Sequence, residues 1–122
     1  MTMPRPNDES KEFFASVIPV EPRVTVKPMF GNLASFMNGN MFAGLFGNQI
    51  FVRLPENDRL LLLEEDGAVE FSPMPGRKMK EYVVLPEQWR NHPDLVKEWL
   101  NKSLSWVETL PVKVPKKKKS KA

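Results

Sequence analysis

Apolar residues gather in one stretch, residues 29–54, in three runs that two short polar breaks separate. The breaks are Asn38-Gly39 and Gly47-Asn48. Each pair is a two-residue hairpin signal, because Asn and Gly adopt positive φ more readily than other residues. Asn-Gly suits a type I′ turn, and Gly-Asn suits a type II′ turn. The pattern therefore predicts a three-stranded antiparallel meander, around which the rest of the chain is organised.

The runs also indicate how the faces of the meander are covered. In residues 50–54, Ile50, Val52 and Leu54 are expected to face the core, and the residues between them, which include Arg53, are expected to face the other side of the sheet. The middle run, residues 41–46, is apolar throughout, which indicates a central strand covered on both faces. Helices would cover one face, and we expect the other to be an interface, most simply a symmetric dimer. The residues expected at this interface are Phe36, Phe42 and Phe51.

A helix and an edge strand are predicted before the meander. Asp8 and Glu9 favour a first helical turn, and pairs of apolar residues spaced four apart give residues 13–18 one apolar face. Pro19 ends this helix. Residues 24–29 are β-prone but contain Pro28, which lacks an N–H, so they form an edge strand or a bend.

A helix, two strands and a longer helix are predicted after the meander. Pro55 and the acids after it begin a helix with four leucines at residues 60–63 and Gly67 as its stop; a buried strand is the alternative. Residues 68–72 and 80–85 are strands. Residues 91–94 cap a helix that ends before Pro111 and carries Leu95, Trp99 and Trp106 on an apolar stripe. The fold class is α+β: helix, three-stranded meander, helix, two strands, helix.

Length and composition limit the chain to one domain. With 122 residues, 41% of them hydrophobic, it can bury one core but not two. We assign residues 8–110 to the domain, between a disordered leader, residues 1–7, and a disordered tail, residues 111–122. No apolar run is long enough to span a membrane and no signal-peptide pattern opens the sequence, so a cytoplasmic location is expected. The absence of cysteine excludes disulfides, zinc-thiolate sites and thiol nucleophiles.

The basic charge belongs to the tail. Six lysines follow Leu110 with no acid among them, which leaves twelve basic and fifteen acidic residues in the rest, a net charge of −3. The tail is therefore expected to bind nucleic acid weakly and without sequence preference, whereas the domain offers no matching basic surface. The residues that would carry this binding are Lys116, Lys117, Lys118, Lys119 and Lys121.

The sequence contains no pattern typical of a catalytic, metal or cofactor site. His92 is the single histidine and is expected to cap a helix. Three consecutive acids at residues 64–66 cannot converge on one ion and are expected to be solvated. The methionines at positions 29, 37, 41, 74 and 79 lie in strand-like patterns without nearby His or Cys, so they are expected to fill the core or an interface.

One group of polar residues carries two interpretations. Lys27, Arg53, Arg77 and Tyr82 could form a pocket for an anion, a carboxylate or a protein partner. The alternative is that the arginines form structural salt bridges with Glu56, Glu70 or Glu81.

Five motifs in a fixed order resemble the N-terminal domain of the TfoX/Sxy competence-regulator family. They are KPMFG at 27–31, NGNMF at 38–42, LFGNQIFVRL at 45–54, the GR and MKEYVVLP segment at 76–86, and the Trp-containing last helix. The resemblance covers about residues 10–110. It implies a compact α+β domain similar to secretion-chaperone-like folds. Two-domain members of the family continue with a helical domain, in whose place this chain has the lysine tail.

The sequence thus predicts a small cytoplasmic, non-enzymatic regulatory or interaction module. A link to competence or transcription rests on the resemblance alone. Weak nucleic-acid binding through the tail is the alternative, and a small enzyme with an arginine-lined anion pocket is the third. The expected partner is a protein or a second copy, with no metal, cofactor or membrane.

Overall fold

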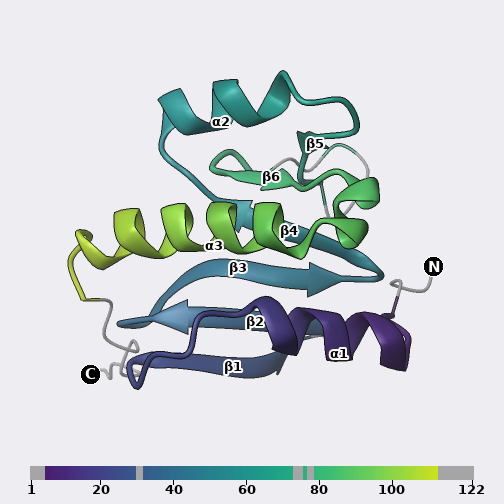
Figure 1. Cartoon of the computed structure of the whole chain (residues 1–122). Helices are drawn as coiled ribbons and strands as arrows, with labels where there is room; N and C mark the ends of the chain where they lie inside the picture. The colour runs from purple at the N-terminus through teal and green to yellow at the C-terminus, as the bar shows by residue number, and fades with distance from the viewer. Residues whose placement is uncertain (1–4, 30–31, 73–75, 77–78, 113–122) are drawn as a thin grey trace.

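The chain folds into a two-layer α+β domain (Figure 1). The computed structural model describes residues 5–29, 32–72, 76 and 79–112. Within them, six strands form one antiparallel sheet in the order β1-β2-β3-β4-β6-β5. The strands are β1 (Val24–Met29), β2 (Asn32–Met37), β3 (Asn40–Phe46), β4 (Gln49–Arg53), β5 (Val69–Glu70) and β6 (Tyr82–Val84).

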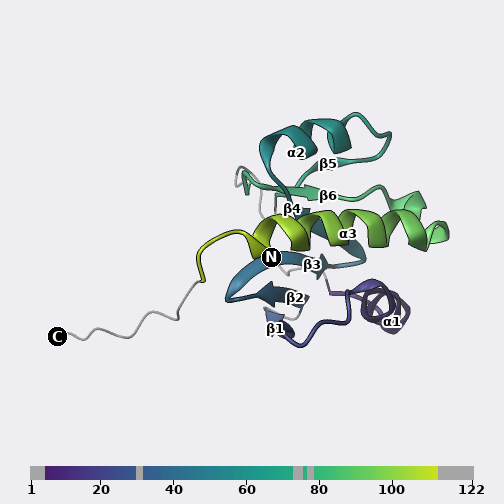
Figure 2. The same ribbon diagram turned by 60° about the vertical axis from the view of Figure 1, so that its left-hand side comes forward.

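Helices lie against one face of this sheet. They are α1 (Asp8–Val17), α2 (Glu56–Leu63) and α3 (Pro93–Glu108), and a short 3-10 turn, η1 (Glu87–Asn91), precedes α3. α3 packs across β3 and β4, α1 lies beside it, and α2 packs at the β6 side (Figures 1 and 2). The predicted α+β class and element order are therefore confirmed, and the lead-in to the meander is itself a strand, β1, at the edge of the sheet.

The two hairpin turns lie where the sequence predicts them. Asn38 and Gly39 both have positive φ, 54° and 82°, as a type I′ turn requires. Gly47 has φ 60°, and Asn48 is not among the described residues with positive φ, which fits type II′. These turns set the register that pairs β2 with β3 and β3 with β4.

Ordered structure begins before the predicted boundary at residue 8. Pro6 is buried. The Asn7 side chain accepts a hydrogen bond from Ser10 N at 2.7 Å and so caps α1, while Asn7 N donates to Asn48 Oδ1 at 3.0 Å. The first turn of α1 is thereby tied to the β3–β4 turn. Residues 1–4 and 113–122, for which disorder was predicted, lie outside the described residues.

Two helix ends differ from the prediction. α2 ends at Leu63 with Glu64 as its C-cap, so Gly67 lies three residues beyond the cap and does not stop the helix. His92 is the N-cap residue of α3, but its side chain makes no capping hydrogen bond, and Pro93 at the first helical position leaves one fewer N–H to satisfy. The preceding 3-10 turn closes instead through His92 N, which donates to Trp89 O at 2.8 Å.

The main core lies between the helices and the sheet. Val96, Leu100, Leu104 and Val107 of α3 are buried against Phe14 of α1 and the inner positions of β2, β3, β4 and β6. Leu95 is 36% exposed and Trp106 is half-buried, so the buried stripe of α3 is rotated away from the predicted one. A second, smaller cluster of Phe51, Phe71 and Val84 lies apart from it.

Candidate functional site

Arg53, the centre of the predicted anion pocket, already has a partner. Its Nε donates to Glu81 Oε1 at 2.6 Å, and its guanidinium lies 5.5 Å from the Trp106 ring centroid and 5.9 Å from that of Tyr82. Burial raises the pKa of Tyr82, which remains protonated and donates to Met41 O at 3.2 Å. The salt-bridge interpretation, with Glu81 as one of the three acids expected, is confirmed for Arg53.

The structure does not bring the four predicted pocket residues together. Lys27 lies on β1, separated from β4 by β2 and β3, and its Nζ is 5.5 Å from the Phe36 ring centroid. Three strand spacings amount to about 14 Å. Arg77 lies outside the described residues. Arg53 and Tyr82, neighbours in the β4–β6 register, form the part of the predicted group that the structure assembles.

The expectation that Phe36, Phe42 and Phe51 share an exposed face is wrong for two of them. Phe42 is fully buried in the main core, and Phe51 is 2% exposed. The register explains Phe42: Ser35 pairs with Ala43 but Phe36 pairs with Met41, so Phe42 is the extra residue of a β-bulge. A bulge places two successive side chains on one side, and both Phe42 and Ala43 enter the core.

Phe51 is covered by a residue that the sequence reasoning did not single out. The Phe71 ring stacks on it with centroids 4.2 Å apart and planes 10° apart, and Phe46 meets Phe71 edge-on at 5.3 Å. Phe51 also lies over Gly44, where a Cβ would come within 2.3 Å of the ring. The chain therefore closes part of this face by itself, and Phe36 remains half-buried.

Side chains on both faces hold the bulge. The Oγ of Ser103, a fully buried residue of α3, is 2.7 Å from Phe42 O and 2.6 Å from Arg53 O. From the other side, Tyr82 Oη donates to Met41 O. These carbonyls lie beside the irregular register, where the ladder leaves acceptors open. One signal in the sequence could have found Ser103, because it is a polar residue on the apolar stripe of α3.

The β1 edge of the sheet is poorly suited to adding another strand. Val24 N donates to Glu21 O at 2.9 Å and so points away from β2. Alternate residues of an antiparallel strand direct their backbone groups to the same side. Pro28 therefore faces outward without an N–H, and Val26 alone, of the fully described strand β1, offers an open donor there. At the opposite edge, β5 has two residues.

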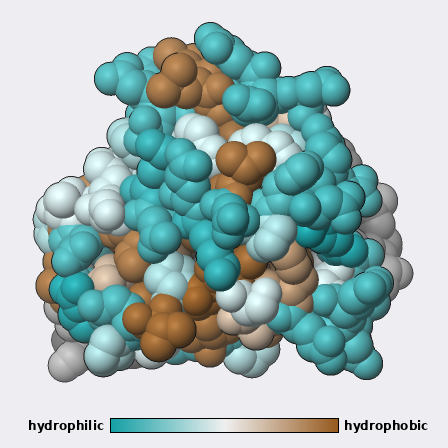
Figure 3. Space-filling view, viewed as in Figure 1, coloured by the Kyte–Doolittle hydropathy of each residue, from teal (hydrophilic) through white to brown (hydrophobic). Residues whose placement is uncertain are grey.

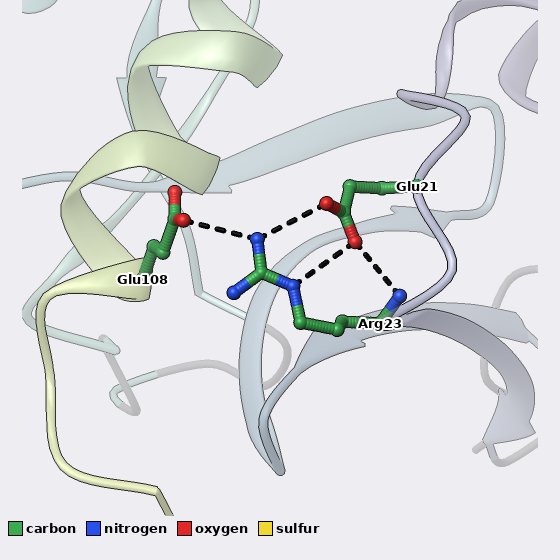
Figure 4. Close-up of polar contacts among 3 residues, drawn as sticks. All are labelled: Glu21, Arg23 and Glu108. Atoms are coloured by element: carbon green, nitrogen blue, oxygen red, sulfur yellow. Dashed lines mark hydrogen bonds and ion pairs between the residues drawn. The ribbon is translucent and has the colours of Figure 1, made fainter.

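An ion-pair group lies on the surface beside β1. Arg23 Nη2 is 3.0 Å from both Glu21 Oε2 and Glu108 Oε2, so one guanidinium joins the α1–β1 connection to the last turn of α3 (Figure 4). The hydrogen bonds from Arg23 hold the pKa of Glu21 below its ordinary value. All three side chains are substantially exposed, so the group connects elements without forming a binding site.

A polar group surrounds a small cavity at the opposite end of α1. Arg90 Nη2 donates to Ser10 Oγ and, at 3.1 Å, to Asn48 O. The cavity beside them has a volume of about 20 Å³, enough for one water molecule. Its lining is mostly apolar, with Ser10, Asn48 and Arg90 among the polar residues, and its size admits a structural water but not a substrate.

An open groove lies between α2 and α3, with a volume of about 620 Å³. We call it the α2–α3 groove. On α3 the residues that line the groove are spaced three or four apart, so they lie on one side of the helix. On α2 the lining residues belong to the N-cap and the first turn. The lining residues are Pro55, Asp58, Glu98, Asn101, Lys102, Ser105 and Trp106.

Apolar side chains are exposed next to this groove. Leu60 and Leu61 are 56% and 57% exposed, because α2 buries Leu62 alone. Leu61 lies three residues after Asp58, on the same side of the helix. Figure 3 shows hydrophobic surface over α2 above a largely hydrophilic α3. The four leucines were predicted to form the body of a helix. Because four consecutive leucines show no difference between the two sides of the helix, the sequence did not indicate that two of them face outward.

The described residues contain no further candidate for bound chemistry. No group of three or more His, Asp or Glu side chains in them is placed to hold a metal ion. None of the helices in the described ranges is long and apolar enough to cross a membrane.

Fold and surfaces together define a small two-layer α+β domain with an open groove between two helices. Comparison with family models then identifies the family. The sequence matches the TfoX N-terminal domain over residues 12–106, from within α1 to the last turns of α3, and the chain belongs to this family. Neither the comparison with curated proteins nor that with solved structures found a match.

Proposed function

We propose that this domain is a non-enzymatic regulatory module that binds a protein partner through α2 and the α2–α3 groove. The observation that carries the proposal is the pair of exposed leucines beside an open groove. Leu60 and Leu61 are adjacent, and a helix whose outer side carries leucine suits a contact with apolar side chains of another protein. Membership of the TfoX N-terminal domain family supports a regulatory role.

The mode of contact follows from which surfaces are open. Strand addition is disfavoured at β1, and two of the three phenylalanines expected at a dimer interface are buried. A partner is therefore expected to use helix-against-groove packing, in which apolar side chains at helical spacing enter between α2 and α3. We place the module in the cytoplasm.

The test compares two leucine changes with a matched control. The variant Leu60→Ser/Leu61→Ser should lose a partner that co-purifies with the unchanged protein at stoichiometric yield. Val26→Ser, which alters a 45% exposed apolar residue on β1, should keep that partner. Melting curves of both variants check that each is folded. Retention of the partner by the leucine variant, or its loss from the Val26 variant, would contradict the proposal.

A second function, weak binding of a polyanion, is favoured by the six lysines after Leu110. Anisotropy of a labelled DNA duplex should show affinity that falls with salt at a log–log slope of about −4 to −5, because each neutralised phosphate releases counterions. Replacing Lys116, Lys117, Lys118 and Lys119 by Ser should abolish binding. Binding that survives this replacement would move nucleic-acid recognition onto the domain.

A further inference from the structure

The chain leaves the domain beside the beginning of β3, at the same end of the sheet as the start of α2 (Figure 1). Asn40 Nδ2, at the beginning of β3, donates to Pro111 O at 3.0 Å. The pairing of Ala43 with Val52 places Arg53, the last residue of β4, beside the bulge near that beginning. α2 starts three residues after Arg53, and in Figure 1 the start of α2 and the end of α3 lie at the same end of the sheet. Because β3 and β4 are neighbouring strands, one strand spacing, about 5 Å, separates the strand that holds Pro111 from the strand that leads into α2.

The remaining chain is long enough to reach the α2–α3 groove. Residues 113–122 span at most about 35 Å when extended. α2 has eight residues and is about 12 Å long. A segment that starts at Val112 can therefore pass the end of α3, enter the groove beside Trp106 and continue along α2.

The charges of the two parts are opposite. Residues 55–67 carry five acidic side chains and one arginine, a net charge of −4, and residues 113–122 carry six lysines and no acid. Within the groove, Asp58 and Glu98 outnumber Lys102. A covalent tether keeps the lysines at an effective concentration in the millimolar range, so even a weak attraction is populated.

Apolar residues match as well. Val112 is 63% exposed where the described chain ends, and in an extended segment Val114 points to the same side. Trp106 and Pro55 line the end of the groove nearest this point, and Leu61 follows six residues after Pro55 along α2. A valine entering beside Trp106 would place the lysines that follow over the acids of α2.

We propose that the lysine-rich segment, residues 113–122, docks in the α2–α3 groove of its own chain. The contact is within one molecule and stands whether or not the groove also binds a protein. It makes the tail a competitor, since a partner entering the groove must displace it and a polyanion must draw the lysines away from α2. Binding of either one would then release the surface that the other uses.

The experiment places a spin label in the tail of the full chain. The sequence has no cysteine, so Ser120→Cys gives a unique site for a nitroxide. Amide signals of residues 58–66 and the indole signal of Trp106 should lose most of their intensity at low salt. They should recover near 1 M NaCl, where the Debye length is about 3 Å.

Two matched charge variants make the result specific. Glu64→Gln/Glu65→Gln removes two exposed acids next to α2 and should restore much of the lost intensity. Glu9→Gln/Glu12→Gln removes two exposed acids on α1 and should restore none. Equal effects of the two variants, loss of intensity at α1 instead, or no loss at all would overturn the proposal. Loss that appears when labelled and isotope-enriched chains are mixed would assign the contact to a second copy and overturn docking within one chain.

Discussion

The two faces of the sheet are closed in different ways. On the helix face, eighteen buried hydrophobic residues in the described chain form one continuous core with α1, α2 and α3. On the other face, Phe51, Phe71 and Val84 are buried, and Met41, Phe46, Met79 and Tyr82 only partly cover them. Most of the stability should therefore come from the helix face. This second face, which we call the aromatic face, is closed locally over β4 and β6, while the edge strand β1 stays largely exposed.

Truncating one phenylalanine on each face should give the largest and most direct test. Phe42→Ala is expected to lower the free energy of unfolding by about 3–5 kcal/mol, because its cavity lies in a core that cannot collapse. Phe71→Ala should lower it by less, since the smaller cluster can relax and admit water. Urea unfolding of both variants measures the difference. A loss from Phe71→Ala as large as that from Phe42→Ala would mean that the aromatic face is a second full core.

Gly44→Ala would disturb the aromatic face by adding a side chain to β3 beneath Phe51. The new Cβ would lie 2.6 Å from Phe51 Cε2 and 2.8 Å from Leu33 O, and the backbone oxygen cannot move away cheaply. We expect a loss of about 3 kcal/mol from overpacking. Phe51→Leu in the same chain should recover part of this loss by freeing the ring contact, leaving the part due to Leu33. No recovery in thermal unfolding would show that the backbone contact dominates.

The bulge allows the two faces to be compared through single hydroxyl groups. Ser103→Ala removes the single buried hydroxyl that lies within hydrogen-bond distance of both Phe42 O and Arg53 O, and should cost about 2 kcal/mol. Tyr82→Phe removes a longer, partly exposed bond to Met41 O and should cost about 1 kcal/mol or less. Chemical denaturation of the pair checks the order. The reverse order would place the stronger anchor on the aromatic face.

The surface ion pairs of Arg23 are expected to contribute least to the free energy of unfolding. Because Arg23 lowers the pKa of Glu21, their contribution is present above the ordinary pKa of 4.5 and is lost as pH falls through the lowered value. Both side chains are in contact with solvent, so Arg23→Met should change the melting temperature only slightly at pH 7 and not at all in 1 M salt. A large shift that persists in salt would reveal packing by the Arg23 stem.

The features that the sequence predicted correctly are those that depend on the preferences of a few neighbouring residues. Asn38-Gly39 and Gly47-Asn48 fixed the hairpins, since positive φ is a property of the residue itself, and Pro28 marked an edge strand. The family assignment rested on the same local motifs and is confirmed. The bulge was not predictable, because strict alternation assigns Phe42 to the outer face and only the pairing of Ser35 with Ala43 moves it inward.

The predicted site failed for a related reason. Grouping Lys27 with Arg53 required knowledge of strand order, and β2 and β3 lie between their strands. The exposure of Leu60 and Leu61 could not be predicted either, because a run of four leucines does not indicate which side of a short helix faces the core. The groove depends on how α2 and α3 lie relative to each other, and no local pattern encodes that arrangement.

The outward side of β1 also bears on how the protein behaves when it is concentrated. Fibril growth stacks identical strands so that each backbone group pairs with the chain above or below. At this edge Val26 offers one donor, Pro28 offers none, and the donor of Val24 is held by Glu21. A strand of a second molecule stacked against β1 would find carbonyl acceptors there but only one free N–H donor, so few of its backbone hydrogen bonds could form. The domain can therefore keep one sheet face partly uncovered and still resist growing into fibres from its longest free edge.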